Sequence, residues 1–137
     1  MPRILLVEDN PGDAQLVRLA LAEALPAARL SIAGDGEQAL SSLLSGATPP
    51  DLIMLDLNLP RMSGHELLAA LRTAEDPVLR RLPVLVLTSS QAEADVERSY
   101  ELGASSHIRK PQELDDLFEV AESISRYWFE TVVLPRR

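Results

Sequence analysis

The sequence predicts an α/β domain in which a five-stranded parallel sheet lies between two layers of helices. Short apolar runs rich in Ile, Leu and Val alternate with longer amphipathic stretches, which is typical of successive strand–helix units. The third run is apolar on both alternating faces apart from one acid, as expected for a central strand that helices cover on each side. The length of 137 residues matches one ordinary domain, so residues 1–137 are expected to form a single domain.

The first two units are marked by a helix cap and by apolar residues at helical spacing. A strand is expected at 3–7, and Asn10 is expected to cap a helix whose first residue is Pro11. The buried side of this helix is expected to consist of Ala14, Val17, Leu21 and Ala24. A second strand at 30–33 leads through an Asp-Gly turn into the next helix. The apolar side of that helix is expected to contain Ala39, Leu40, Leu43 and Leu44.

The third unit carries the acid that interrupts the most apolar strand. This strand is expected at 52–57, with Asp56 near its end. Ser63 and Glu66 have the spacing of a capping box, and the helix that follows has an apolar side made of Leu67, Leu68 and Leu71. The polar segment 73–82 contains a proline and is expected to be a connection to the fourth strand.

The last two units differ in how well their helices are anchored. The fourth strand is expected at 83–88, and the helix at about 92–102 has many charges and few large apolar residues, so we expect it to pack weakly. The fifth strand, 105–109, is the least apolar and suits an edge of the sheet. The final helix is expected to bury one continuous side, made of Leu114, Leu117, Ala121, Ile124 and Trp128.

An apolar extension at about 126–137 continues from this final helix. It offers more apolar surface than one helix side needs, contributed by Trp128, Phe129, Val132, Val133 and Leu134. Two interpretations are open: the extension covers its own domain, or it pairs with a second copy of the chain. The second is favoured, so a homodimer through the last helix and the extension is expected.

Composition and charge exclude several classes of protein. The chain has no cysteine, so neither a disulfide framework nor a cysteine-based zinc site holds it together, which suits the cytoplasm. The net charge of −8 repels nucleic-acid backbones, so protein partners are expected and a nucleic-acid partner is not. No apolar stretch has the length of a signal peptide or a membrane span, so a cytoplasmic protein without a membrane partner is expected.

Polar side chains follow four of the predicted strands at the point where each strand ends. In an open parallel sheet these ends share one edge, so residues far apart in the sequence meet there. The residues expected at this edge are Glu8, Asp9, Asp56, Asn58, Thr88 and Lys110. Taken singly, the acidic pair, the hydroxyl and the Lys-Pro step have ordinary explanations as helix starts, caps and strand exits. A carboxylate that ends the most apolar strand has no such explanation, and the whole set predicts a functional site.

The chemistry of this set predicts phosphoryl transfer at a divalent metal ion. Glu8, Asp9 and Asp56 offer only oxygen ligands, so magnesium is favoured over zinc, and a cation would relieve the repulsion among the three carboxylates. Asp56 is the candidate nucleophile, and Lys110 supplies positive charge beside it. The Thr88 hydroxyl is placed to donate to a phosphoryl oxygen and to transmit a change to the weakly packed helix after it.

Four motifs carry a resemblance to a known family. LLVEDN, LIMLDLNLPRMSG, PVLVLTSS and HIRKP resemble the receiver domain of two-component response regulators, over nearly the whole chain. The resemblance implies a flavodoxin-like three-layer fold with strand order 2-1-3-4-5. It also implies that Asp56 is the phosphoacceptor, that Thr88 is the switch hydroxyl and that Lys110 contacts the phosphoryl group. It implies further that a Mg²⁺ (or Mn²⁺) ion is held by Glu8, Asp9, Asp56 and the backbone carbonyl of Asn58.

The resemblance implies a signalling role rather than a metabolic enzyme. Family members take the phosphoryl group from a sensor histidine kinase and catalyse only their own phosphorylation and dephosphorylation. They usually carry Tyr or Phe three positions before the lysine, coupled to the switch hydroxyl, where this chain has His107. His107 is expected to tune a partner surface from the edge strand; the alternative is that it makes signalling pH-sensitive. The resemblance also implies a cis peptide bond between Lys110 and Pro111.

Three further segments resemble a subgroup of this family. EDNPGDA, EDPVLRRLP and YWFETVVLP are similar to the small single-domain regulators that are paired with bacterial phytochrome kinases. This likeness implies a phytochrome-type histidine kinase as the partner. It also implies that the extended last helix and tail form a homodimer.

Two other functions share parts of this pattern. Phosphohydrolases of the haloacid dehalogenase type also use a strand-end Asp, a Thr or Ser, a Lys and magnesium. They carry a second Asp two positions after the nucleophile, however, where this chain has Asn58. A pseudo-receiver would keep the fold as a binding module without phosphorylation. The intact set of Asp9, Asp56, Thr88 and Lys110 argues against that interpretation.

Overall fold

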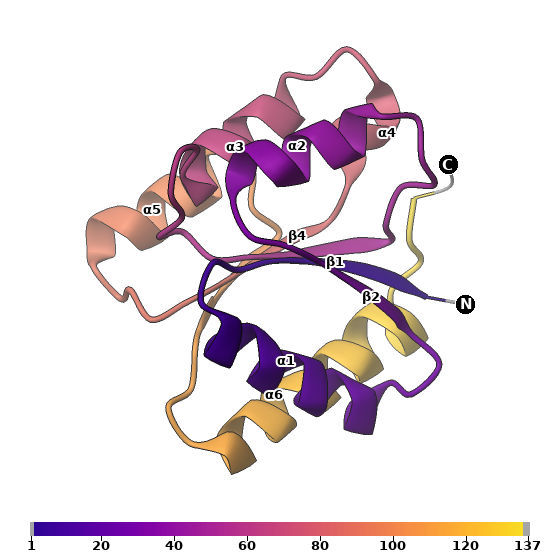
Figure 1. Ribbon diagram of the computed structural model, residues 1–137, viewed down its shortest axis with the longest axis vertical. Coiled ribbons are helices and arrows are strands. Elements are labelled where there is room, and N and C mark those ends of the chain that lie inside the picture. The colour runs from indigo at the N-terminus through magenta and orange to yellow at the C-terminus, as the bar shows by residue number, and fades with distance from the viewer. Residues whose placement is uncertain (1, 136–137) are drawn as a thin grey trace.

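Three layers make up the fold of residues 2–135, the part of the chain that the computed structural model describes (Figure 1). The central layer is a parallel sheet of five strands in the order β2-β1-β3-β4-β5. These strands are β1 (Arg3–Val7), β2 (Arg29–Ala33), β3 (Leu52–Leu55), β4 (Val84–Thr88) and β5 (Ser106–Arg109). The predicted flavodoxin-like fold and its strand order are therefore confirmed.

Helices cover both faces of the sheet (Figure 1). One face carries α1 (Pro11–Ala24) and α6 (Leu114–Arg126). The other face carries α2 (Gly36–Leu44), α3 (Gly64–Arg72), α4 (Pro77–Arg81) and α5 (Glu93–Glu101). After α6 the chain continues into a π-helical turn, η1 (Tyr127–Thr131). Because the strands are parallel, all their carboxyl ends lie at one end of this sandwich.

The central strands are held firmly because their side chains are buried on both faces. In β1, Ile4 and Leu6 belong to the apolar cluster beneath α1 and α6, whereas Leu5 and Val7 belong to the cluster beneath α2 and α3. Alternation along a strand sends neighbouring side chains to opposite faces. All residues of β3 are buried in the same way. This packing fixes the strand ends from which the polar residues project.

Two predicted helix starts are confirmed. The Asn10 side chain accepts a hydrogen bond from the Asp13 backbone N–H at the start of α1. At the start of α3, Ser63 and Glu66 form a full capping box, in which each side chain accepts from the other residue's backbone N–H. Both helices therefore begin at a defined residue shortly after a strand that carries polar residues at its end.

Three predictions about the helices are wrong in detail. The segment 73–82 is more than a connection, because Asp76 caps the short helix α4 and Leu79 on that helix is buried. Leu44 is 62% exposed, since it is the last residue of α2 and lies beyond the core. Leu114 is 41% exposed as the first residue of α6, for the same reason. Helical spacing predicts which way a side chain points, but not where the core ends.

The elements around the strand ends differ in how firmly they are held. β3 ends at Leu55, two residues earlier than predicted, so Asp56 follows the strand directly. By contrast, Ser99 is the one buried residue of α5, in agreement with the prediction that this helix packs weakly. β5 forms an edge of the sheet, and none of its residues is fully buried. A rigid centre and a loosely packed edge therefore meet at this end of the sheet.

The apolar extension after α6 is partly covered by its own domain. Trp128 and Phe129 pack against the cluster beneath α1 and α6, and the rings of Tyr127 and Trp128 meet edge to face with their centroids 5.4 Å apart. Val133, in contrast, is 94% exposed. Residues 136–137 of the predicted extension lie outside the described residues. Folding back thus covers the start of the extension and leaves Val133 uncovered.

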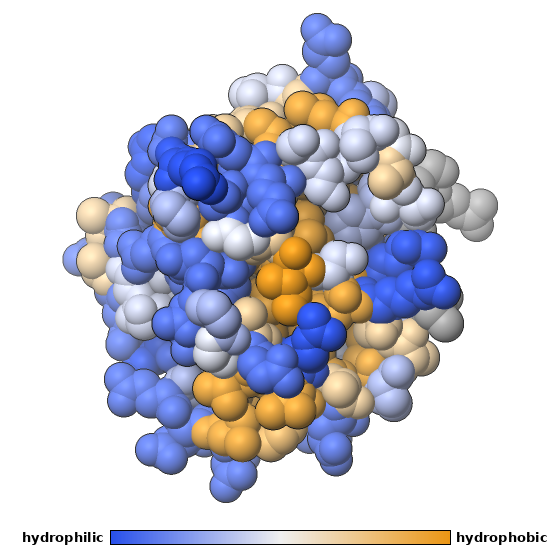
Figure 2. Space-filling view, in the orientation of Figure 1, coloured by the Kyte–Doolittle hydropathy of each residue, from blue (hydrophilic) through white to orange (hydrophobic). Residues whose placement is uncertain are grey.

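The surface is mixed, and Figure 2 shows one face of it. Apolar residues gather along the middle of this face, between the two helical layers, with hydrophilic residues around them. Large apolar side chains are exposed on α1 and α2, namely Leu16, Leu19 and Leu44. Within residues 2–135, none of the helices is long and apolar enough to cross a bilayer.

Replacement of Gly64 by alanine should destabilise the fold. A Cβ atom at this first residue of α3 would lie 2.4 Å from the backbone carbonyl oxygen of Asp56 and 2.7 Å from Leu57 Cα. Backbone atoms cannot rotate away as a side chain can, so the helix or the loop must shift. We expect Gly64→Ala to lower the free energy of unfolding by about 1–3 kcal/mol, measured by urea denaturation. Gly34→Ala is the matched control, because its Cβ would make only an ordinary contact of 3.5 Å, and an equal loss there would contradict this account.

Candidate functional site

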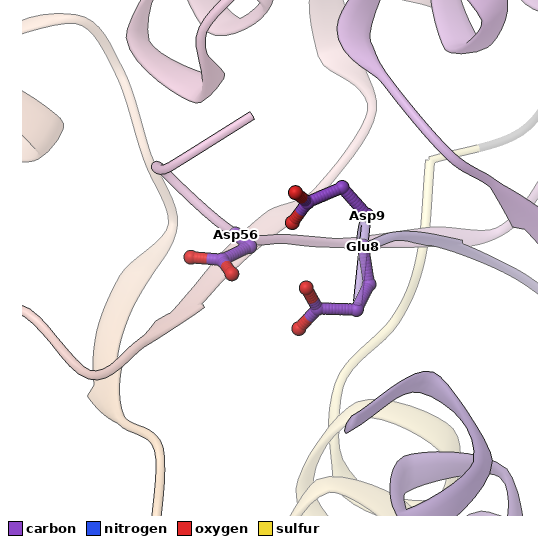
Figure 3. Close-up of side chains that lie close together, drawn as sticks. All are labelled: Glu8, Asp9 and Asp56. Atoms are coloured by element: carbon purple, nitrogen blue, oxygen red, sulfur yellow. The ribbon is translucent and has the colours of Figure 1, made fainter. Parts of the chain in front are cut away.

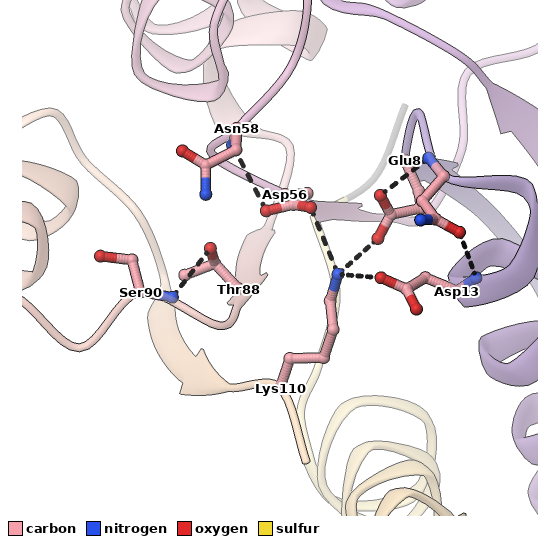
Figure 4. Close-up of polar contacts among 8 residues, drawn as sticks. Glu8, Asp13, Asp56, Asn58, Thr88, Ser90 and Lys110 are labelled. Atoms are coloured by element: carbon pink, nitrogen blue, oxygen red, sulfur yellow. Dashed lines mark hydrogen bonds and ion pairs between the residues drawn. The ribbon is translucent and has the colours of Figure 1, made fainter. Parts of the chain in front are cut away.

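The polar residues predicted to share one edge of the sheet lie together there (Figure 4). Glu8 and Asp9 follow β1, Asp56 follows β3, Thr88 ends β4 and Lys110 follows β5. Glu8, Asp56 and Thr88 are buried, with 4%, 8% and 0% of their surface exposed. Buried polar groups cost free energy unless they are paired. Their partners therefore determine what this site can do.

Three carboxylates at this edge are close enough to share one cation. The side chains of Glu8, Asp9 and Asp56 converge, and their ligand oxygens lie within 4.8 Å of one another (Figure 3). Glu8 and Asp56 are buried, whereas Asp9 is exposed and opens the cluster to solvent. Carboxylate oxygens without sulfur or imidazole suit a hard divalent cation, Mg²⁺ or Mn²⁺, and do not suit zinc. The residues present thus fit the predicted metal.

One ammonium group lies among these acids. Lys110 Nζ is 2.5 Å from Glu8 Oε1, 3.2 Å from Asp56 Oδ2 and 3.3 Å from Asp13 Oδ2 (Figure 4). Burial lowers the pKa of Lys110, but the hydrogen bond to Glu8 and the charges of Asp56 and Glu8 outweigh burial and raise the pKa above its usual value. The ammonium therefore keeps its charge at neutral pH and holds the two buried acids in place.

Glu8 is the acid most strongly affected by its surroundings. Burial raises the pKa of the Glu8 carboxyl above its usual value; the hydrogen bond from Lys110 opposes this effect, and the charge of Asp56 adds to it. The second oxygen of Glu8 accepts a hydrogen bond of 3.2 Å from the Asn10 backbone N–H. Lys110 bonds to Glu8, Asp13 and Asp56, and Asp9 adds a fourth carboxylate close to Glu8 and Asp56, so the site has an excess of negative charge that attracts a divalent cation.

Asp13 is a member of this site that sequence reasoning missed. It lies in the first turn of α1, where an acid is favoured by the helix dipole and needs no other explanation. Its carboxylate nevertheless bonds to Lys110, which comes from the far end of the chain. Its position could have predicted this contact, because Asp13 lies one helical turn after Asn10, and that helix begins at the edge where the polar residues meet. Periodicity alone does not show that Lys110 reaches that turn.

The backbone after β3 orients the Asp56 carboxylate. The Asn58 backbone N–H lies 3.4 Å from Asp56 Oδ1, while Lys110 bonds to the other carboxylate oxygen (Figure 4). The Asn58 side chain is exposed. Both oxygens of Asp56 thus have defined partners from different elements. The predicted role of the Asn58 carbonyl as a metal ligand stays a prediction.

Thr88 lies at the start of a loop that leads to the weakly packed helix α5. Its side chain is fully buried, and its Oγ1 atom accepts a hydrogen bond of 3.3 Å from the Ser90 backbone N–H. His107 on β5 lies on the other side of Ser90, with Nε2 at 3.3 Å from the Ser90 carbonyl oxygen. His107 is half-buried, and its ring contacts Ser99 of its own chain; its expected role at a partner surface stays a prediction.

A salt bridge restrains the loop between Asp56 and α3. Arg61 has a positive φ of 64°, a conformation that is uncommon for residues other than glycine. Its guanidinium lies 2.6 Å from Asp35 Oδ2, and Asp35 also caps α2 by accepting from the Gln38 backbone N–H. The loop that follows the candidate nucleophile is thus tied to the start of a neighbouring helix.

The expected cis bond between Lys110 and Pro111 is absent. No peptide bond of the described residues is cis, so this bond is trans. Trans is the lower-energy form of an X–Pro bond by roughly 0.5–1 kcal/mol. The Lys110 backbone N–H still donates to the Thr88 carbonyl at 2.8 Å, and Nζ still reaches the acids. The geometry of the site therefore does not require the cis form.

The residues predicted to form a dimer lie away from these acids. Figure 1 places the yellow segment after α6 at the opposite end of the sheet from the strand ends that carry Asp56 and Lys110. As far as residue 135, the extension therefore contributes no side chain to the site of its own chain.

Comparisons with known proteins agree with this geometry. A model of the response regulator receiver domain family matches residues 4–122. Response regulator Rcp1 of Synechocystis sp. is 42% identical over 137 residues, which cover 96% of this chain and 92% of that protein. The crystal structure of the phosphorylated cyanobacterial phytochrome response regulator RcpA matches with a TM-score of 0.91 at 38% identity, over 98% of this chain and 99% of that one. The Mn²⁺-bound form of Rcp1 matches with a TM-score of 0.88 at 40% identity, over 99% of this chain and 100% of that one.

The charge of Asp35 should stabilise the fold at neutral pH and not in acid. The hydrogen bond from the Gln38 N–H, helped by the Arg61 guanidinium, holds the pKa of the Asp35 carboxyl below its ordinary value of 3.8. A carboxyl whose pKa is lower in the folded state contributes stability above the unfolded pKa and loses it as the pH falls through the folded pKa. Asp35→Asn keeps a capping oxygen and removes only the charge.

We therefore expect Asp35→Asn to be less stable than the wild type at neutral pH, with a difference that vanishes as the pH falls through the folded pKa of Asp35. Urea denaturation at a series of pH values measures this difference. Glu119→Gln, at an exposed acid on α6, should show no such difference at any pH. A stability difference for Asp35→Asn that persists in strong acid would contradict the role of the charge.

Proposed function

The chain belongs to the response regulator receiver domain family, and we propose that it accepts a phosphoryl group on Asp56 from a sensor histidine kinase. One observation supports the choice of Asp56 as the phosphoacceptor. The buried Asp56 carboxylate lies at the end of a central strand, bonded to Lys110 and within reach of two further acids. We also infer that residues 1–137 act as a single receiver domain with an apolar extension.

Asp56 is the nucleophile in the proposed reaction. A carboxylate oxygen of Asp56 attacks the phosphorus of a phosphohistidine, a P–O bond forms, and the P–N bond breaks. The electron pair of that bond returns to the imidazole nitrogen of the kinase. The product is an acyl phosphate, which water later hydrolyses to restore the carboxylate and release phosphate. The protein thus catalyses its own phosphorylation and dephosphorylation and turns over no separate metabolite.

The acids hold the divalent cation that this reaction needs. We assign Glu8, Asp9 and Asp56 as its carboxylate ligands, together with the backbone carbonyl of Asn58. The ion is Mg²⁺ or Mn²⁺; the Mn²⁺-bound structure of Rcp1 supports this choice. When bound, the cation neutralises charge on the transferring phosphoryl oxygens. Negative charge in excess of Lys110 at this edge supports the same assignment.

Lys110 and Thr88 are the groups that respond to the new phosphoryl group. Lys110 Nζ already bonds to Asp56, so a small displacement brings it onto a phosphoryl oxygen. Its partner Asp13, which is less buried than Glu8 and Asp56, is the easiest one to release. The Thr88 hydroxyl turns from Ser90 and donates to another phosphoryl oxygen. Since Ser90 adjoins His107 and leads into α5, we assign Thr88 and His107 as the switch residues.

We infer that the partner is a phytochrome-type histidine kinase in the cytoplasm. Support comes from RcpA, a cyanobacterial phytochrome response regulator that matches nearly the whole chain. A phosphohydrolase of the haloacid dehalogenase type is not favoured, because Asn58 stands where a second acid would be needed and the matching family model is that of the receiver domain. A pseudo-receiver is not favoured either, because all the charged groups that the chemistry needs lie within contact distance.

We also propose that two chains associate through the last helix and its extension. The residues assigned to this contact are Trp128, Phe129, Val132, Val133 and Leu134. Val133 is almost fully exposed, and Tyr127 at the start of the extension is 55% exposed. Apolar groups that the domain itself leaves uncovered are available for a second copy.

Asp56→Asn should abolish phosphorylation. Incubation of the wild type with acetyl phosphate and Mg²⁺ should add the mass of one phosphoryl group, detected by intact-protein mass spectrometry, because the carboxylate acts as nucleophile. Asp56→Asn should show no gain, and the wild type with a chelator should also show none. Asp116→Asn, at an exposed acid on α6, is the matched control and should be phosphorylated normally. A gain that survives in Asp56→Asn would place the phosphoryl group elsewhere.

Val133→Lys should weaken self-association without unfolding the chain. Its side chain is 94% exposed, so a charge there costs little in the monomer but would be buried in the proposed dimer. Analytical ultracentrifugation should show a dimer for the wild type and at least a tenfold weaker association for the variant, or roughly 1.4 kcal/mol. Leu19→Lys, on α1 and 47% exposed, is the control and should leave the dimer intact. A monomeric wild type would sink the proposed dimer.

A further inference from the structure

Both histidines of the chain contact the same hydroxyl group. His65 Nε2, on α3, lies 3.2 Å from Ser99 Oγ, and His107 Nδ1, on β5, lies 3.1 Å from it. Ser99 is the buried residue of α5 and has no exposed surface. Three elements that are far apart in the sequence are thus joined at one oxygen atom.

The Ser99 hydroxyl has a single proton, and its surroundings show where that proton goes. Ser99 Oγ lies 2.9 Å from the backbone carbonyl oxygen of Asp95, a group that can only accept. Once Ser99 donates to Asp95, its oxygen can only accept from the two imidazoles. His65 Nε2 and His107 Nδ1 must therefore both carry a proton for both contacts to be hydrogen bonds.

The other ring nitrogen of His107 needs a proton as well. His107 Nε2 lies 3.3 Å from the backbone carbonyl oxygen of Ser90, which again can only accept. An imidazole that donates from both nitrogens is a positively charged imidazolium. The complete set of contacts therefore requires one proton more than neutral His107 has. For His65 the neutral ring with its proton on Nε2 is sufficient.

Ser90 connects these contacts to the phosphorylation site. Its backbone N–H donates to Thr88 Oγ1, and its backbone carbonyl faces His107. Its side chain donates to Asp95 Oδ2 at 2.5 Å. When Thr88 turns toward a phosphoryl oxygen, the Ser90 N–H loses its acceptor, and the loop is free to change conformation. The Ser90 carbonyl is then no longer held against His107.

Charged and titratable groups face His107 from several elements. α5 supplies the Asp95 carboxylate, which is bonded to Ser90, and the Tyr100 hydroxyl, which accepts from the His107 backbone N–H at 3.1 Å. α3 supplies the His65 imidazole. Along β5, Arg109 is the next residue on the same face, and its side chain is exposed. If His107 is charged, the Asp95 carboxylate lies near Ser90, its hydrogen-bond partner in the loop. The exposed Arg109 is its neighbour on the same face of β5.

We propose that His65, Ser99 and His107 form a proton-linked bridge, the imidazole bridge, which holds the unphosphorylated arrangement of the loop between β4 and α5. The bridge is complete when His107 carries a proton on both nitrogens. It releases one proton when phosphorylation of Asp56 draws Thr88 away from Ser90. This inference rests on the proposed function of Asp56. It deepens that function by naming how the loop is regulated.

A proton that binds more tightly to the unphosphorylated arrangement than to the phosphorylated one shifts the equilibrium between them. The unphosphorylated arrangement holds the extra proton, so acid favours it and a higher pH favours the phosphorylated one. One linked proton changes the ratio of the two states by up to about tenfold per pH unit. His107→Phe removes the titrating group and should remove this dependence.

The first experiment examines the unloaded protein. Nitrogen-15 NMR of the two imidazoles in the wild type should show His107 protonated on both nitrogens and His65 neutral with its proton on Nε2. At the same pH, Ser99→Ala should show the loss of the doubly protonated signal of His107, because its acceptor is gone. Ser123→Ala on α6 is the matched control, since the Ser123 hydroxyl also donates to a backbone carbonyl four residues earlier, that of Glu119, and its loss should leave that signal in place. A singly protonated His107 in the wild type at about pH 6 would overturn the proposal.

The second experiment adds Mg²⁺ and beryllofluoride, a mimic of the phosphoryl group. Loading should convert His107 from the doubly to the singly protonated form at constant pH. Loading of the wild type should rise with pH relative to His107→Phe in the same buffers. A His107 signal that does not change on loading would overturn the link between the bridge and the site. A protein that shows the bridge but takes up no beryllofluoride would overturn the phosphoacceptor role of Asp56 and, with it, this link.

Discussion

The site depends on the ion cluster formed by Lys110 and the buried acids. Glu8 and Asp56 follow β1 and β3, two of the three interior strands, where unpaired carboxylates would cost several kcal/mol each. Lys110 reaches both of them from the edge strand, so a single ammonium ties the ends of β1, β3 and β5 together. Negative charge remains in excess, because Asp13 bonds to the same ammonium and Asp9 lies close to both buried acids. The cluster therefore stabilises the strand ends at rest and still attracts the cation that phosphoryl transfer needs.

Around this cluster the protein is rigid on one side and loosely packed on the other. The central strands are buried on both faces, and α3 begins so close to Asp56 that only a glycine fits at position 64. On the other side, α5 buries a single polar residue, and β5 is an edge strand. A conformational change therefore costs least along the loop from Thr88 through Ser90 to α5. The hydrogen bonds from the two histidines to Ser99 hold α5, the helix into which that loop leads. A small difference in free energy can therefore shift the equilibrium between two conformations of the loop.

The two ends of the sheet carry different groups. The carboxyl ends of the strands carry the acids and Lys110, whereas the extension after α6 lies at the opposite end. Trp128 and Phe129 complete the core beneath α1 and α6, so the start of the extension belongs to the domain itself. Val133 remains exposed beyond it. Phosphorylation and self-association can thus use separate surfaces. Helix α6 packs against the core and also leads into the surface proposed for self-association.

The sequence by itself determined the order along the chain of the five strands and of every helix from α1 to α6 except α4, the caps of α1 and α3, and the edge at which Asp56, Thr88 and Lys110 meet. It could do so because apolar periodicity and capping residues are local signals, and because parallel strands place all their carboxyl ends together. Tertiary structure alone decided that Asp13 bonds to Lys110, that Leu44 and Leu114 lie outside the core, and that the bond before Pro111 is trans. It also decided that His65 and His107 share Ser99. These features depend on how far a side chain reaches and which distant groups it meets, and no local pattern encodes those distances.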